Sequence, residues 1–147
     1  MIKWIASLLI VLVLPTFAQT LEDAYEISFS GIAAQKVRLS LIALNIANAT
    51  TLEDEETGLP FQKRYAVLAP DPKGVRVVKI ERSKRPFGKY YDPSVPQSNV
   101  EGFTAYPNIN LPDEMVNLAY TEMLMEANTT AFKATKQMIT NVLEILR

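Results

Sequence analysis

The chain has 147 residues, of which 48% are hydrophobic and 21% charged, a composition typical of one globular domain with a core. It contains no cysteine and no histidine, which excludes disulfides and thiolate metal sites and removes the commonest general base. We therefore expect no enzyme and no catalytic, cofactor or metal site, and a net charge of −1 favours neither nucleic acid nor anionic lipid as a partner.

Residues 1–18 have the features of a secretory signal peptide. Lys3 supplies a positive charge, residues 4–14 are an unbroken run of apolar and small residues, and Pro15 is expected to break the helix. Cleavage is predicted between Ala18 and Gln19, which would export the chain beyond the cytoplasm. The apolar run of about eleven residues is short for a bilayer span, and an uncleaved anchor is the alternative interpretation.

Residues 19–50 predict an N-terminal helix with one apolar face. Gly31 interrupts this face, and it either permits close approach of another helix or marks a kink. Asparagines in such a seam can fix helix register, although the last of them could instead end the helix. The residues at heptad spacing and their companions are Ile27, Ala34, Leu41 and Asn48, with Val37, Leu44 and Asn45 beside them.

Residues 51–110 predict a small β-rich domain. Seven of the nine prolines and four of the five glycines lie in this part of the chain, which excludes a long helix. Strands at 64–69 and 75–81 with a Pro/Gly turn between them predict a β-hairpin, and residues 87–91 predict a short third strand.

Two charged stretches of this middle part are interpreted as solvated surface. The alternatives are a cation site at the acidic loop of residues 53–56 and a surface for an acidic partner at the basic stretch. The basic stretch consists of Lys79, Arg82, Lys84, Arg85 and Lys89.

Residues 111–147 predict a long C-terminal helix that packs with the N-terminal one. Asn110 is expected to cap it and Pro112 suits its first turn. The companion seam positions Thr121, Asn128 and Thr135 are polar, so the helix is expected to complete its core with other helices. Apolar residues recur every seven positions at Leu111, Leu118, Met125, Phe132, Ile139 and Leu146, and Met115 and Met138 widen the stripe.

The predicted fold is therefore α+β. Long amphipathic N- and C-terminal helices form a coiled-coil-like α-helical core, with a small β-rich insertion between them. Apolar stripes left uncovered at both ends of a chain favour assembly with other subunits. A closed intramolecular bundle explains the same stripes equally well on pattern alone.

Several segments carry a family resemblance. They are residues 30–35 (SGIAAQ), 45–50 (NIANAT), 101–108 (EGFTAYPN), 114–117 (EMVN), 126–128 (EAN) and 132–138 (FKATKQM). The first two resemble the N-terminal signature of the flagellar axial proteins of the bacterial rod and hook. The others resemble, within that family, the proximal rod proteins of the basal body. The chain departs from the pattern at Met125 and Glu126, where an aromatic residue and a glutamine are usual.

The resemblance implies a structural subunit in the periplasmic part of the flagellar basal body, which polymerises through its terminal helices and transmits torque. It implies other flagellar rod proteins and the rod–MS-ring adaptor as partners, with the surrounding P ring as a further candidate, and no cofactor or small-molecule substrate. The family normally uses the flagellar type III export route without a cleaved signal. The alternative function is a periplasmic helical adaptor or ligand-binding module that is a closed monomer.

The residues expected at the assembly interface combine the seam positions with the Tyr-Pro-Asn segment that leads into the last helix. They are Ile27, Gly31, Ala34, Val37, Leu41, Leu44, Asn45, Asn48, Tyr106, Asn108, Met115, Leu118, Met125, Asn128, Phe132, Met138, Ile139 and Leu146.

Overall fold

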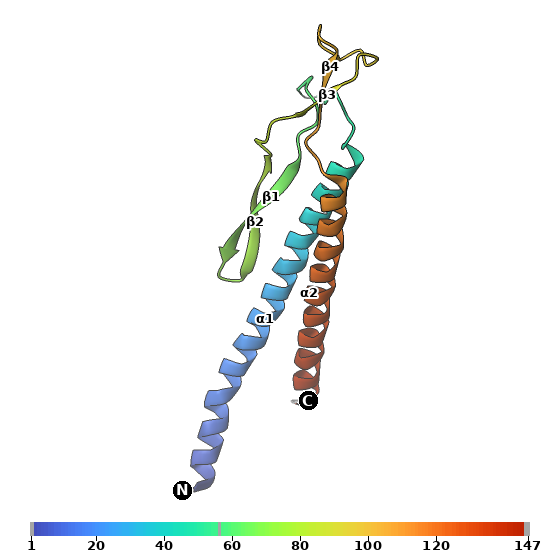
Figure 1. The fold of residues 1–147 in the computed structure, drawn as a ribbon. Helices are drawn as coiled ribbons and strands as arrows, with labels where there is room; N and C mark the ends of the chain where they lie inside the picture. Colours follow the sequence, from blue (N-terminus) through green and yellow to red (C-terminus); the bar gives the residue numbers. More distant parts are fainter. Residues whose placement is uncertain (1, 56, 146–147) are drawn as a thin grey trace.

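Two long helices and four short strands make up the molecule. The computed structural model describes residues 2–55 and 57–145, and for residues 2–20 it describes the backbone alone. The elements in chain order are α1 (Ile2–Ala47), β1 (Arg64–Asp71), β2 (Gly74–Arg82), β3 (Gly88–Tyr91), β4 (Phe103–Tyr106) and α2 (Leu111–Ile145). The helices run antiparallel, converge where α1 ends and α2 begins, and diverge toward the chain ends (Figure 1). This arrangement confirms the predicted α+β class.

The first helix differs from its prediction at both ends. It begins at Ile2 and continues through Pro15, so the expected break at this proline is wrong. A proline inside a helix removes one backbone hydrogen bond and can kink the helix without ending it. At the other end the Asn48 side chain donates to the Leu44 carbonyl at 2.9 Å, so Asn48 closes the helix. Cleavage after Ala18 stays a prediction.

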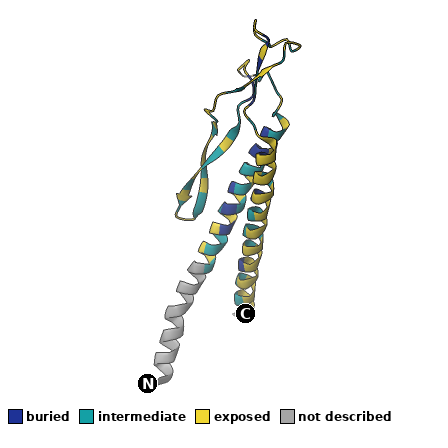
Figure 2. Ribbon diagram, in the orientation of Figure 1, coloured by how far each residue is buried: buried dark blue, intermediate teal, exposed yellow. Residues whose placement is uncertain are grey.

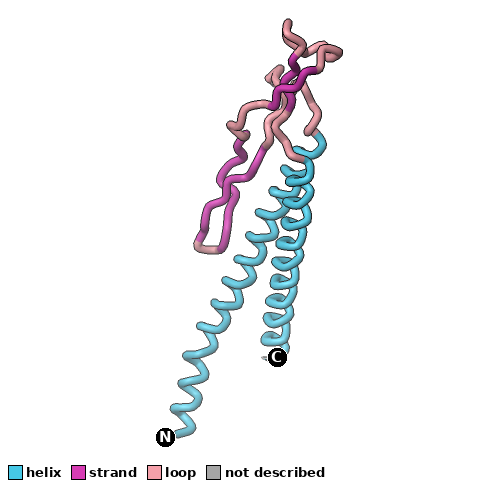
Figure 3. Tube along the Cα trace, viewed as in Figure 1, coloured by secondary structure: helices cyan, strands magenta, loops and turns pink. Residues whose placement is uncertain are grey.

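The central element is α1, which contacts α2, β1 and β2. Among the described residues α2 packs on α1 and on no strand, and Lys63, which precedes β1, reaches its first turn through Glu114. The segment Leu21–Ala47 has the length and hydropathy of a membrane span, and the same segment packs against α2 and the hairpin. Figure 3 shows the first two strands along α1 and the other two beyond the converging helix ends.

The strands form two separate antiparallel pairs rather than one sheet. β1 pairs with β2 from Arg64↔Arg82 to Asp71↔Gly74, with a bulge at Val67/Leu68, which confirms the predicted hairpin. β3 confirms the short third strand, whereas its partner β4 was missed. Four residues of mixed pattern between a glycine and a proline give too little periodicity to predict a strand.

The core is thin and largely polar (Figure 2). Its buried apolar side chains among the described residues are Ala34, Leu41, Ile42 and Phe61, and its buried polar ones are Ser28, Asn45, Thr104, Glu114, Thr121 and Thr135. Many large apolar side chains remain exposed on the same molecule. A chain with so little apolar core has surfaces left to bury against other molecules.

Candidate functional site

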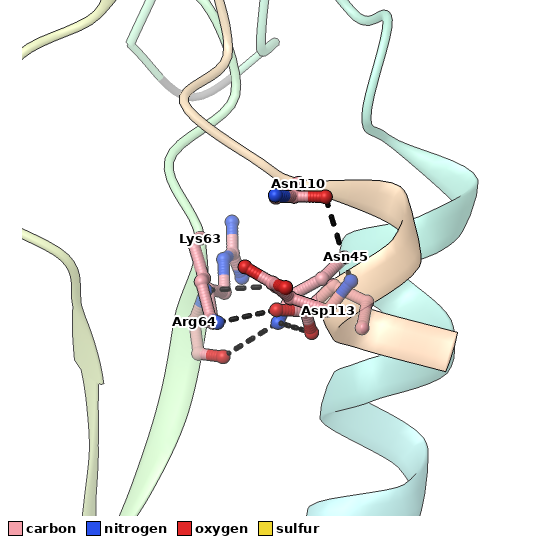
Figure 4. Close-up of polar contacts among 6 residues, drawn as sticks. Asn45, Lys63, Arg64, Asn110 and Asp113 are labelled. Carbon is pink, nitrogen blue, oxygen red and sulfur yellow. Dashed lines mark hydrogen bonds and ion pairs between the residues drawn. The ribbon is translucent and has the colours of Figure 1, made fainter. Parts of the chain in front are cut away.

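A buried polar cluster lies where the two helices converge, drawn in Figure 4. The Asn45 amide, in the last turn of α1, pairs with the backbone of Arg64: its Nδ2 donates to the Arg64 carbonyl at 2.9 Å, and the Arg64 N–H donates to its Oδ1 at 2.8 Å. Nδ2 also donates to Glu114 Oε2 at 3.3 Å, while Lys63 Nζ forms an ion pair with Glu114 Oε1. The side chains of Asn45 and Glu114 are each 1% exposed. This polar junction ties α1, the start of β1 and the start of α2 together.

The first turn of α2 explains how a carboxylate reaches this buried position. Asn110 caps the helix, since its Oδ1 accepts from the Asp113 N–H at 3.4 Å and its carbonyl accepts from the Glu114 N–H at 3.0 Å. A carboxylate in the first turn is also favoured by the positive end of the helix dipole. The cap therefore confirms the predicted helix start, and it points Glu114 inward toward Asn45 and Lys63.

The seam between α1 and α2 is built from small, polar and aromatic side chains. A Cβ on Gly31 would lie 2.8–3.0 Å from the Asn128 amide, so this glycine permits close helix approach. The Phe132 ring contacts Tyr25 at 4.4 Å and Phe29 at 6.2 Å between centroids. Thr121 is fully buried. Its burial costs little because its hydroxyl donates to the Asn117 carbonyl of its own helix at 2.7 Å. The polar seam positions are thus packed within one chain.

The predicted interface residues divide by exposure into three groups. The buried ones are Gly31, Ala34, Leu41 and Asn45. The half-buried ones are Val37, Leu44, Asn48, Tyr106, Leu118, Met125, Asn128, Phe132 and Ile139. The exposed ones are Ile27, Asn108, Met115 and Met138, and Leu146 lies outside the described residues. Only the exposed group is free to contact another subunit without rearrangement.

A second apolar face of α2 lies away from α1, and Met138 is the one residue of it that was predicted at an interface. Three alanines, Ala127, Ala131 and Ala134, occupy the middle of this face and are also exposed. Their helical spacing places them on one face with five larger apolar residues, and no charged residue interrupts the set. We name this set the outer stripe; its larger members are Val116 (69% exposed), Tyr120 (56%), Met123 (68%), Met138 (51%) and Ile145 (83%). The spacing of 116, 120, 123, 127, 131, 134 and 138 was the signal that could have found it.

Residues 86–108 form a small head around β3 and β4. The Asp92 carboxylate accepts from the Ser94 hydroxyl at 2.6 Å and from the Tyr106 hydroxyl at 3.1 Å, while the Asp92 carbonyl accepts from the Thr104 hydroxyl at 3.0 Å. Asn108 Nδ2 donates to the Pro86 carbonyl at 3.0 Å. Tyr106 and Asn108 therefore hold the head together, and a role for them toward another subunit stays a prediction.

The Asp92 contacts predict a pH dependence of the head. Hydrogen bonds from Ser94 and Tyr106 hold the pKa of Asp92 below its usual range, and the bond to Asp92 raises the pKa of Tyr106. The contact therefore stabilises the head above the usual pKa of an aspartate, and this contribution is lost as the pH falls through the lowered value. Deprotonation of the Tyr106 hydroxyl also removes this stabilising contribution, at a pH above the usual tyrosine range. Tyr106→Phe is expected to raise the Asp92 pKa part of the way toward its ordinary value.

An NMR titration of the Asp92 carboxyl carbon measures this effect. Ser94→Ala is expected to raise the pKa of Asp92 more, because the Ser94 bond is the larger cause. Tyr90→Phe is the matched control, since the Tyr90 ring packs on Tyr106 at 5.6 Å but its hydroxyl does not bond Asp92. An equal response to Tyr90→Phe and Tyr106→Phe would contradict the assignment.

The remaining surface contains several grooves. Within residues 2–55 and 57–145, no three carboxylates gather as they would around a metal ion, the acidic loop included. An apolar groove of about 560 Å³ lies where the helices diverge, between Leu21 and Tyr25 of α1 and Ile139, Val142 and Leu143 of α2. The main features are thus a helix pair joined by the polar junction and an exposed apolar surface. Exposed apolar surface of this kind is common in proteins that assemble with others.

Comparison with known proteins gives relatives that share one name and whose alignments cover most of the chain. No protein-family model matches it. The flagellar basal-body rod protein FlgC of Borreliella burgdorferi is 31% identical, in an alignment that covers 85% of this chain and 97% of that protein. The proteins of the same name from Bacillus subtilis (31% identical, covering 81% and 93%) and Aquifex aeolicus (33%, covering 83% and 94%) are similar to the same extent.

Proposed function

Because the chain belongs to the FlgC family of flagellar basal-body rod proteins, we propose that it is a subunit of the proximal rod that polymerises through its terminal helices. Family membership makes it a structural component of the flagellar basal body. The finer proposal is that the assembled subunits form a periplasmic drive shaft, which transmits torque to the outer parts of the flagellum. Proposed partners are other rod proteins, the rod–MS-ring adaptor and the surrounding P ring.

The observation that carries polymerisation is the outer stripe of α2. Its five larger apolar side chains are all more than half exposed along a helix of 35 residues, which is about 50 Å long. Since α2 already meets α1 through the polar seam, the stripe has no partner within the described chain. Contiguous apolar surface of this length marks a site of protein association. The closed monomer would leave the whole stripe in water.

Stiffness is what a shaft requires of its subunit, and the fold supports this role. The two helices are joined by the polar junction at one end, and the hairpin braces the C-terminal half of α1, with its tip at Ile27 and Ser30. A rotation of α1 relative to α2 would break the buried bonds of Asn45 and Glu114. Breaking bonds to a buried charge costs more than breaking exposed ones, so the pair resists torsion.

Met123→Glu tests the proposal. A charge within the outer stripe would be desolvated without a partner on assembly, so this variant is expected to abolish motility and incorporation into basal bodies. Met123 is 68% exposed, so the free energy of unfolding should change by no more than about 0.5 kcal/mol. Motility assays and immunoblots of isolated basal bodies give the readout.

Lys133→Glu serves as the control, because it adds negative charge at an exposed position of α2 outside the stripe. It should preserve motility. Normal motility and normal incorporation of the Met123→Glu variant would refute assembly through this face.

A further inference from the structure

A basic groove lies beside the polar junction. It has a volume of about 440 Å³ and is lined by Lys63, Tyr65, Ser83, Lys84 and Arg85. The connector that follows β2 is held in place, since the Ser83 N–H donates to the Lys63 carbonyl at 2.7 Å and the Arg85 N–H donates to the Ser83 hydroxyl at 3.3 Å. Lys84 and Arg85 are exposed, and within the described part of the chain neither forms an ion pair. The groove therefore presents two positive charges that form no ion pair within the described chain, although the Glu81 carboxylate lies near enough to Lys84 for their charges to interact.

Glu53, Asp54 and Glu55, the described residues of the acidic loop, lie on another side of the same junction. Asp54 anchors the loop, because its N–H donates to the Leu59 carbonyl at 2.8 Å and its carboxylate lies 3.5 Å from Arg64. Glu53 and Glu55, on either side of Asp54, are exposed and make no ion pair among the described residues. They border a groove that also contains Phe61 and Arg64.

The two charged surfaces flank one short segment. The basic groove includes Lys63, while the groove of the acidic loop includes Phe61 and Arg64. They therefore lie at the same level along the helix pair. A second copy placed beside the first at that level can bring its acidic loop to the basic groove, and its own basic groove remains free for a third copy.

We propose that the basic groove of one subunit binds the acidic loop of a second copy, with Lys84 and Arg85 facing Glu53 and Glu55. This inference rests on the proposed rod function and names a lateral contact within the rod. Two different surfaces meet in it, so the contact repeats along an open array rather than closing as a pair, as a shaft requires. With a net charge of only −1, the chain has no general attraction for its copies that could replace this local complementarity. Exposed charges at such a contact supply orientation and association rate, while the outer stripe supplies buried area.

Charge exchange provides the test, in a strain that lacks its own copy of the gene. The variants Lys84→Glu/Arg85→Glu and Glu53→Lys/Glu55→Lys are each expected to lower the amount of chain recovered in basal bodies by about tenfold, since attraction becomes repulsion at the contact. The variant that carries all four substitutions should recover assembly, because the signs are exchanged together. Co-expression of the two separate double variants should also recover it, through alternating copies.

Three results would overturn the contact. The first is an unchanged amount of both double variants in isolated basal bodies. The second is a four-fold variant that does not regain assembly, which would assign the charges to a different partner. The third is an equal loss in Lys36→Glu/Lys133→Glu, an exposed pair with the same change of net charge, because that would be a general charge effect. Failure of the rod function itself is distinguished by Met123→Glu, which would then leave motility intact.

Cross-linking gives a readout that does not depend on motility. The chain has no cysteine, so introduced thiols are unique. Basal bodies that contain both a Glu55→Cys chain and an Arg85→Cys chain are expected to yield disulfide-linked dimers after mild oxidation. Either variant alone should yield none, since two acidic loops do not meet. Dimers from Glu55→Cys alone would contradict the contact between unlike surfaces.

Discussion

Glu114→Ala is expected to lower the free energy of unfolding by about 2–3 kcal/mol, since it removes a charged acceptor from a buried position. The substitution leaves Asn45 Nδ2 without its bond to α2 and leaves Lys63 without a counterion. The Lys63 side chain is 34% exposed and can turn to water, so the loss should fall below the roughly 3–5 kcal/mol typical of a fully buried pair. Chemical denaturation of the full chain measures it.

Glu122→Ala is the matched control on the same helix. Its carboxylate is exposed, and it should change stability by no more than about 0.5 kcal/mol. Glu114→Gln keeps an acceptor for Asn45 but removes the charge, so its effect should lie between those of the two alanine variants. Equal stabilities for Glu114→Ala and Glu122→Ala would show that the polar junction does not hold the helices together.

The elements that could be predicted from sequence are those set by local pattern. The helix beginning at Leu111 follows from Asn110 and the residues after it, because capping involves neighbours along the chain. The β1–β2 hairpin follows from strand-forming residues on both sides of a Pro-rich turn that ends in Gly74. In both cases the interactions that decide the structure are close in sequence.

The polar junction could not be predicted, because its partners are far apart in sequence. Asn45 and Glu114 are separated by 69 positions, and each has an ordinary local explanation as a seam amide or a first-turn acid. Only the fold brings them together. Asn45 was correctly singled out as a polar helix contact, whereas its partner was missed for this reason.

The face that α2 turns to α1 was only half predicted. The six-fold apolar repeat beginning at Leu111 predicted one stripe as the contact face. Thr121 and Thr135, from the polar companion positions, are nevertheless more deeply buried than the described residues of that apolar repeat. Threonines can be buried in a helix at little cost because their hydroxyls bond to the preceding turn. This frees larger apolar residues such as Tyr120 and Met123 for the outer stripe, where burial depends on assembly.

Gly74→Ala is expected to weaken docking of the hairpin tip on α1 by about 2–4 kcal/mol, from backbone strain and overlap together. Gly74 has φ of +120°, and an added Cβ would lie 2.1 Å from Ser30 Oγ and 3.1 Å from Ile27 Cα. Ser30 can rotate, but the Ile27 backbone belongs to α1 and cannot. The Val75 N–H donates to Ser30 Oγ at 3.1 Å, so its hydrogen-exchange rate reports the loss of docking.

Gly58→Ala separates strain from overlap. Gly58 also has a positive φ, of 63°, but an added Cβ would meet nothing within 4 Å, so only the backbone cost of about 1–2 kcal/mol applies. Ser30→Ala combined with Gly74→Ala should recover only part of the loss, because the contact with Ile27 remains. Full recovery would mean that Ser30 alone sets the approach. Ser30 and Gly31 are adjacent, so one turn of α1 contacts the hairpin through Ser30 and α2 through Gly31. Partial recovery would explain why these two residues occur as a pair.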